Sequence, residues 1–183
     1  MKKILVPTDF SKQATLAVEV AADIARKSGA ELTLLHVIEE AVGNSMNIEG
    51  QVTADAGWEE KLFTMKLIEK AKKQMAKFTD DSKLDGIKVK QELRIGSPYH
   101  GMNTIISEKK VDLVVMGTAG RSDLEQMIIG SNTEKVVRTA HCPVLTVHNK
   151  PQSKEFKNIV YATSMDKQEE VFSRIVRATQ KLY

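Results

Sequence analysis

Short apolar runs alternate with stretches of helical periodicity through most of this chain, and this alternation limits the fold more than any other feature. The apolar runs are residues 3–8, 32–38, 87–95, 111–116 and 144–147. Apolar residues recur at helical spacing between them, in residues 14–29, 58–78, 97–110 and 131–140. Runs this short and apolar are typical of buried strands. The alternation predicts an α/β fold, a doubly wound five-stranded parallel sheet sandwiched by helices.

Three segments of this pattern carry more specific expectations. Residues 87–95 alternate apolar with charged side chains, which predicts a strand at the edge of the sheet. Residues 39–57 are rich in glycine and asparagine and predict a long mobile loop that closes as a lid. The helix over residues 58–78 is expected to face the core with one apolar stripe, formed by Leu62, Met65, Ile68, Met75 and Phe78.

Composition excludes several classes of protein. Apolar residues make up 42% of the 183 residues and charged residues 28%, which argues against extended disorder. The formal charge of +3 is interspersed, so no nucleic-acid partner is expected. The start lacks the apolar region of a signal peptide, and no run reaches the roughly 18 residues of a membrane span, so we expect a cytoplasmic protein without a membrane partner. Cys142, the single cysteine, rules out an internal disulfide and a cysteine-based zinc site.

The end of the sequence is similar to its beginning. KNIVYATS at residues 157–164 aligns with KKILVPTD at residues 2–9, and the same shift pairs Lys12-Gln13 with Lys167-Gln168. Two unrelated strand–helix units can also share such features by chance. We interpret residues 1–150 as one domain, and residues 151–183 as a linker followed by the first strand and helix of an incomplete second copy. Ser164 stands where the first copy has Asp9, so the tail lacks that carboxylate.

A glycine-rich stretch carries the strongest chemical signal. Gly117 and Gly120 follow the most apolar run, while Gly130 precedes Ser131 and Asn132 at the start of a predicted helix. Glycines let backbone N–H groups approach an anion closely, and a helix N-terminus presents unpaired amides and a positive dipole end. Each residue alone has an ordinary structural explanation, since glycines make turns and serine caps helices. Together they favour a phosphate site.

The pattern GxxGx9GS followed by TEKVVRTAHCPVLTV resembles the universal stress protein family, and in particular its ATP-binding subgroup. The opening KKILVPTDFS and the LLHV of the second run are also similar to this family, so the resemblance extends over residues 1–149. It implies a Rossmann-like adenine-nucleotide-binding domain that holds ATP or AMP. It also implies a homodimer that pairs the last strand across a two-fold axis, through residues 143–149.

The resemblance also implies a set of binding residues at the carboxyl ends of the strands. Base and ribose would contact Pro7, Thr8, Asp9 and Val37; Met116 and Gly117 would flank the ribose; and Gly120, Gly130, Ser131 and Asn132 would receive the phosphates. Ala119 and Asn132 depart from the residues common in the family, which affects side-chain detail but not the backbone amides.

Two charged residues near this site have alternative roles. Asp9 can accept from ribose hydroxyls or hold Mg²⁺ with the phosphates, or it can cap the following helix. Arg121 can reach a terminal phosphate or remain a solvated surface side chain. Cys142 is better explained as a small hydrophobe than as a nucleophile, and the four histidines form neither a ligand spacing nor a catalytic triad.

These residues predict a nucleotide-binding stress-response or signalling module with an unknown protein partner. The lysine of a P-loop is missing, so rapid hydrolysis is not expected. Two alternatives remain: a slow metal-dependent ATPase that uses Asp9, and a nucleotide-free scaffold. Flavin binding is a more distant alternative, because neither the single tryptophan nor any of the three tyrosines adjoins the glycine stretch.

Overall fold

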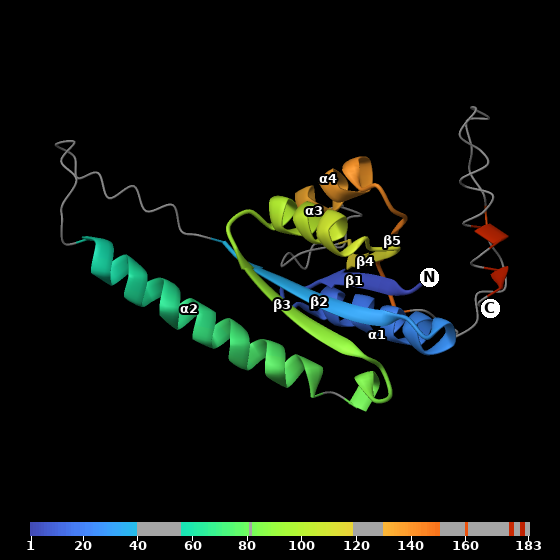
Figure 1. The fold of residues 1–183 in the computed structure, drawn as a ribbon, viewed down its shortest axis with the longest axis horizontal. Coiled ribbons are helices and arrows are strands. Elements are labelled where there is room, and N and C mark those ends of the chain that lie inside the picture. The colour runs from blue at the N-terminus through green and yellow to red at the C-terminus, as the bar shows by residue number, and fades with distance from the viewer. Residues whose placement is uncertain are drawn as a thin grey trace.

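The computed structural model describes residues 1–39, 56–80, 82–118 and 130–150, with residues 160, 176, 177, 180 and 181 of the remainder. The strands are β1 (Lys3–Pro7), β2 (Glu31–Ile38), β3 (Val89–Ile95), β4 (Leu113–Gly117) and β5 (Val144–Val147). The helices are α1 (Lys12–Ser28), α2 (Ala56–Thr79), α3 (Pro98–Lys109) and α4 (Ser131–Thr139), with a 3-10 turn at Ser82–Leu84. All neighbouring strands are parallel, in the order β3-β2-β1-β4-β5 (Figure 1). The predicted fold is confirmed, with β3 at an edge as expected.

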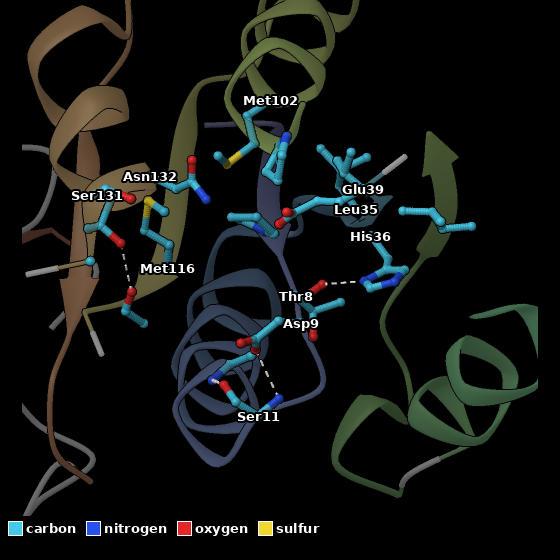
Figure 2. Close-up of a pocket in the computed structure, with 18 of the residues that line it drawn as sticks. Thr8, Asp9, Ser11, Leu35, His36, Glu39, Met102, Met116, Ser131 and Asn132 are labelled. Atoms are coloured by element: carbon cyan, nitrogen blue, oxygen red, sulfur yellow. Dashed lines mark hydrogen bonds between the residues drawn. The ribbon is translucent and has the colours of Figure 1, made fainter. Parts of the chain in front are cut away.

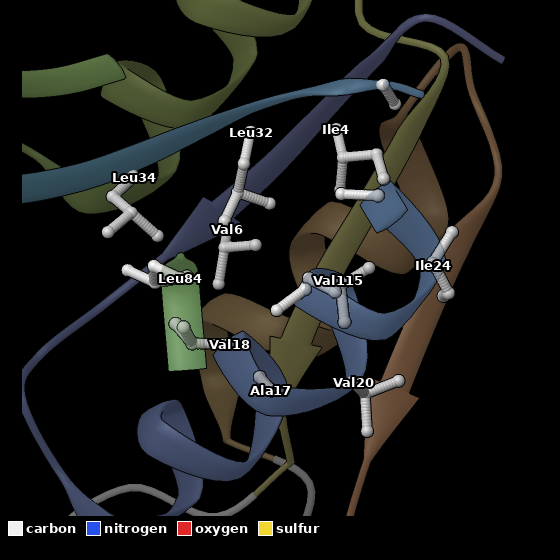
Figure 3. Packing of buried hydrophobic residues seen from close by; sticks show 14 of the residues in the cluster. Ile4, Val6, Ala17, Val18, Val20, Ile24, Leu32, Leu34, Leu84 and Val115 are labelled. Carbon is white, nitrogen blue, oxygen red and sulfur yellow. The ribbon is translucent and has the colours of Figure 1, made fainter. Parts of the chain in front are cut away.

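Helices cover both faces of the sheet because successive strand residues point to opposite sides. On one face, Ile4, Val6, Leu32, Leu34 and Val115 pack against α1 and the C-terminal half of α2 (Figure 3). On the other face, Leu5, Leu35, Val114 and Met116 of the sheet form one cluster with Met102 and Ile105 of α3 and Val136 of α4. The inner strands β1, β2 and β4 are therefore buried on both sides, which explains why they form nearly continuous apolar runs.

Some element boundaries differ from those predicted, and local hydrogen bonds explain two of the differences. The β3 strand begins at Val89 rather than at residue 87, because Ile87 N–H donates to Leu84 C=O in the preceding turn. The β4 strand begins at Leu113 rather than at residue 111, after Asp112 accepts from the backbone amides of Lys2 and Lys3. At the other end β4 extends one residue further, to Gly117.

The predicted core stripe on α2 is wrong for the first half of that helix. Met75 is buried, and Ile68 and Phe78 are half-buried, but Leu62 is 43% exposed and Met65 is 60% exposed. The five residues spread over more than half of the helix circumference at about 100° per residue. In addition, the first half of α2 extends beyond the sheet (Figure 1). Only the C-terminal half therefore has a sheet face to cover.

Strand order reverses between β1 and β4, which are neighbours although α1, β2, α2, β3 and α3 lie between them in the sequence. The connections from β1 lead to one side, and the connection after β4 leads to the other. Open α/β sheets bind ligands at such a switch point, outside the carboxyl ends of the strands. The topology therefore predicts a ligand site among the residues that follow β1, β2 and β4.

Two expectations fall mainly outside the described residues. The predicted lid at residues 39–57 is described only at Glu39 and from Ala56, where α2 already begins. Most of the predicted incomplete copy after residue 150 also lies outside the description, so the division at residue 150 stays a prediction. Among the described residues, no helix is long and apolar enough to cross a membrane.

Candidate functional site

A cavity of about 580 Å³ opens at the carboxyl ends of β1, β2 and β4 (Figure 2). It brings together nine of the predicted site residues: Pro7, Thr8, Asp9, Val37, Met116, Gly117, Gly130, Ser131 and Asn132. The other two, Gly120 and Arg121, lie outside the described residues. The cavity is large enough for a small-molecule ligand, since such pockets usually measure about 300–1,000 Å³.

The turn between β1 and α1 forms one wall and is held by short-range hydrogen bonds. Thr8 N–H donates to Leu35 C=O at 2.8 Å, and Thr8 Oγ1 accepts from Phe10 N–H at 3.0 Å. Asp9 Oδ1 accepts from Ser11 N–H at 2.9 Å, while Ser11 Oγ caps α1 by accepting from Ala14 N–H. Ser11, not Asp9, is therefore the N-cap, so the capping alternative for Asp9 is wrong. The Asp9 carboxylate remains on the cavity wall.

His36 supports the same turn, a role that no local sequence pattern indicates. Its Nδ1 lies 2.8 Å from Thr8 C=O, and its ring lies against Phe10 with 4.5 Å between ring centroids. A carbonyl only accepts, so Nδ1 donates, and the neutral ring carries its hydrogen there. Phe10 has a positive φ of 62°, which is uncommon for a bulky residue. The bonds around it hold this conformation.

The N-terminus of α4 forms the opposite wall. Gly130 occupies the N-cap position without a side-chain cap, and its N–H donates to Thr118 C=O at 2.8 Å. Thr133 Oγ1 donates to Gly117 C=O at 3.1 Å and so ties the first turn of the helix to the end of β4. Ser131 is the first residue of α4 and does not cap it. Helix geometry gives the Ser131 and Asn132 amides no intrahelical acceptor, so they can bind an anion.

Gly117 and Gly130 are glycines for different reasons. A Cβ at Gly117 would lie 3.0 Å from the backbone C and O of Gln13, so a side chain there would collide with α1. Among the described residues, which do not include 119–129, a Cβ at Gly130 would meet nothing closer than 3.6 Å, and its φ of −59° suits any residue. Packing therefore explains Gly117, whereas the described part of the protein does not require a glycine at position 130.

An apolar side of the cavity comes from α3 and α2 and was missed by sequence reasoning. Pro98 and Met102 of α3 and Leu67 of α2 line it beside Val37. The α3 helix approaches β2 closely at Gly101, where an added Cβ would lie only 2.9 Å from Val37 Cγ2. No local motif marks these residues, and only the packing of α3 on the sheet brings them to the site.

The carboxylates that line the cavity do not form a metal centre by themselves. Asp9 and Glu39 line the cavity. Within the described residues, no group of three or more histidine, cysteine or acidic side chains could hold a metal ion. Asp9 alone fits the usual mode of Mg²⁺ binding, in which one or two carboxylates hold the ion together with substrate phosphates.

Cys142 is placed as expected for a small hydrophobe. It packs against the cluster beneath α3 and α4 and does not line the cavity. Burial raises the pKa of its thiol, and Asp112 raises it further. The side chain therefore stays a neutral thiol near pH 7, which disfavours a nucleophilic role.

Comparison with known proteins identifies the family. The model of the universal stress protein family matches residues 1–148. Universal stress protein MJ0531 of Methanocaldococcus jannaschii is 34% identical over 146 residues, covering 80% of this chain and 81% of the relative. Protein MJ0577 of the same organism is 32% identical over 155 residues, covering 81% of this chain and 96% of the relative.

Solved structures agree with this result. The structure of MJ0577 matches with a TM-score of 0.64 and 32% identity, covering 82% of this chain and 98% of that chain. A universal stress protein from Archaeoglobus fulgidus in complex with dAMP matches with a TM-score of 0.54, covering 80% of this chain and 97% of that one. Its 20% identity shows a common fold alone. The family match over residues 1–148 and the relatives above 30% identity show that this chain belongs to the universal stress protein family.

Proposed function

We propose that this chain is a stress-response or signalling module that binds ATP or AMP in the cavity. The observation that carries the proposal is the first turn of α4. Gly130 leaves room beside the Ser131 and Asn132 amides, and no described residue of the protein fills that room. A phosphate that accepts hydrogen bonds from these amides would explain the missing side chain. The A. fulgidus relative solved with dAMP is consistent with this ligand class.

The rest of the cavity suits the other parts of an adenine nucleotide. Val37 and Met102 would contact the base, while Pro7, Thr8 and Asp9 would line the base and the ribose. Met116 and Gly117, which lie between this wall and α4, would flank the ribose. Gly120 and Arg121 would add phosphate contacts, as the family resemblance implies, and Asp9 would hold Mg²⁺ with the phosphates.

Titration calorimetry of the full chain tests this proposal directly. We expect saturable binding of ATP and AMP, and weaker binding of adenosine because it lacks the group that contacts α4. Mass spectrometry of small molecules released from the purified protein identifies the ligand carried from the cell. A protein that takes up neither nucleotide with or without Mg²⁺ would support the nucleotide-free scaffold instead.

Asp9→Asn separates a binding module from a slow ATPase. Asparagine keeps an oxygen for Ser11 N–H, so the turn should persist, but the charged acceptor for the ribose or the metal is lost. For a binding module we expect Kd for ATP to rise about tenfold, in line with hydrogen bonds to charged groups. Hydrolysis per bound ATP should stay at its low wild-type level. A loss of turnover at saturating ATP would instead assign Asp9 a catalytic role.

Other parts of the functional interpretation rest on the sequence and family resemblance. The predicted homodimer through residues 143–149 would use β5, which forms one edge of the described sheet. An unpaired strand edge is what such an interface requires. The cytoplasmic location and the incomplete second copy remain predictions of the same kind.

A further inference from the structure

The first half of α2 carries an unusual concentration of exposed apolar side chains. Trp58 is 59% exposed, Leu62 is 43% exposed and Met65 is 60% exposed, and they follow one another at intervals of one helical turn. Phe63, at 53%, lies further round the helix. These four make up half of the large exposed apolar residues in the described part of the chain. Clustered exposed apolar surface usually marks an interaction site.

This apolar stripe, Trp58-Leu62-Met65, faces away from the sheet. Ala71 and Met75 are the buried residues of the described part of α2, and at 3.6 residues per turn they lie about 105–145° round the helix from the middle of the stripe. Figure 1 shows that the N-terminal half of α2 also extends past the end of the sheet. A broad surface can therefore approach the stripe without meeting the body of the domain.

Lysines flank the apolar stripe on both sides. Lys61 lies to one side of it, and on the other side Lys66, Lys70, Lys73 and Lys77 line one shallow surface along the helix. These side chains are exposed. Glu69 continues the line of the stripe one turn beyond Met65 and ends its apolar part. An apolar strip with a row of lysines along one side and a further lysine on the other is typical of a helix that lies in the interface of a membrane.

We propose that the first half of α2 binds peripherally to an anionic lipid surface, with the stripe at the acyl boundary and the lysines at the head groups. A second copy of this helix is disfavoured as the occupant, because the lysines of the two copies would face one another. The helix has six lysines and no arginine. Arginine is preferred for paired contacts with protein carboxylates, whereas lysine suits the diffuse field of anionic lipids. This proposal departs from the expectation, drawn from the sequence, of no membrane partner, which rested on the lack of a membrane-spanning run. Peripheral binding needs no such run and is independent of the nucleotide site.

Trp58 provides a direct probe, because it is the only tryptophan of the chain. We expect its emission to shift to shorter wavelength when the full-length protein is mixed with vesicles of phosphatidylcholine and phosphatidylglycerol in equal amounts. Vesicles of phosphatidylcholine alone should produce little shift, and added salt should weaken the effect. A shift that appears without lipid as protein concentration rises would show self-association and overturn the proposal.

Variants locate the surface through co-sedimentation with the same vesicles. Lys66→Ala with Lys70→Ala should lower the vesicle partition coefficient roughly 25-fold, at about fivefold per lysine. A control that removes two exposed lysines elsewhere, Lys12→Ala with Lys135→Ala, should change it much less. Equal losses from both pairs would show binding through net charge alone and contradict the assignment to α2.

The apolar contribution has its own matched pair. Leu62→Ser should reduce vesicle binding, whereas Ile95→Ser, which changes an exposed residue on β3, should leave it unchanged. Both variants keep Trp58, so the emission shift can be followed in each. The proposal would be overturned if the wild-type protein did not bind anionic vesicles. It would also be overturned if the protein bound polyglutamate more strongly than vesicles, a result that would favour an acidic protein partner.

Discussion

Gly130→Val is expected to weaken ATP binding at least about 100-fold while the fold stays native. The loss corresponds to removing two charge-assisted hydrogen bonds from the Ser131 and Asn132 amides to phosphate. Valine can adopt the backbone conformation of Gly130, with φ −59° and ψ 144°, and its Cβ has space among the described residues. The N-cap would be poorer, at a cost of about 1 kcal/mol in the free energy of unfolding. Calorimetry measures the affinity, and far-UV circular dichroism checks the fold.

Asn132→Ala is the matched control, because it removes a side chain at the same turn and keeps the backbone amide. We expect it to change the dissociation constant for ATP much less than Gly130→Val does. If folded Gly130→Val bound ATP as tightly as the wild type, the phosphates would not lie at α4. If Asn132→Ala caused the larger loss, the side chain and not the amide would be the anchor.

The fold was predictable because each element depends on local pattern. Doubly buried strands such as residues 32–38 need continuous apolar runs, and the parallel order follows from the alternation with helices. The site was predictable in large part for a related reason. Pro7, Val37 and Met116 are at or beside the ends of strands, and in a parallel sheet these ends meet at one edge.

Features that depend on packing between distant elements were not predictable. Periodicity showed that α2 has apolar residues, but not that its first half extends beyond the sheet, so Leu62 and Met65 were wrongly assigned to the core. Met102 reaches the cavity because α3 packs closely on β2 at Gly101. The bond from His36 to Thr8 joins β2 to the turn after β1 and leaves no mark in either local sequence.

Gly117→Ala is expected to lower the free energy of unfolding by about 2–3 kcal/mol, as overpacked sites do. The added Cβ would lie 3.0 Å from main-chain atoms of Gln13, and a main chain cannot turn aside as a side chain can. The α1 helix would have to move off β4, and Ala17 and Val18 of that helix belong to the same packed cluster as Val115 (Figure 3). Urea unfolding followed by circular dichroism measures the loss.

Gly101→Ala is the control that separates this effect from a general intolerance of side chains at glycine. Its Cβ would lie 2.9 Å from Val37 Cγ2, a methyl group rather than main chain, so Val37 has to shift slightly, and alanine is the better helix former by about 1 kcal/mol. We expect its stability to stay within about 1 kcal/mol of the wild type. If Gly117→Ala were equally neutral, α1 would not be held against β4 at this point. Gly117 would then need a ligand-based explanation, as Gly130 does.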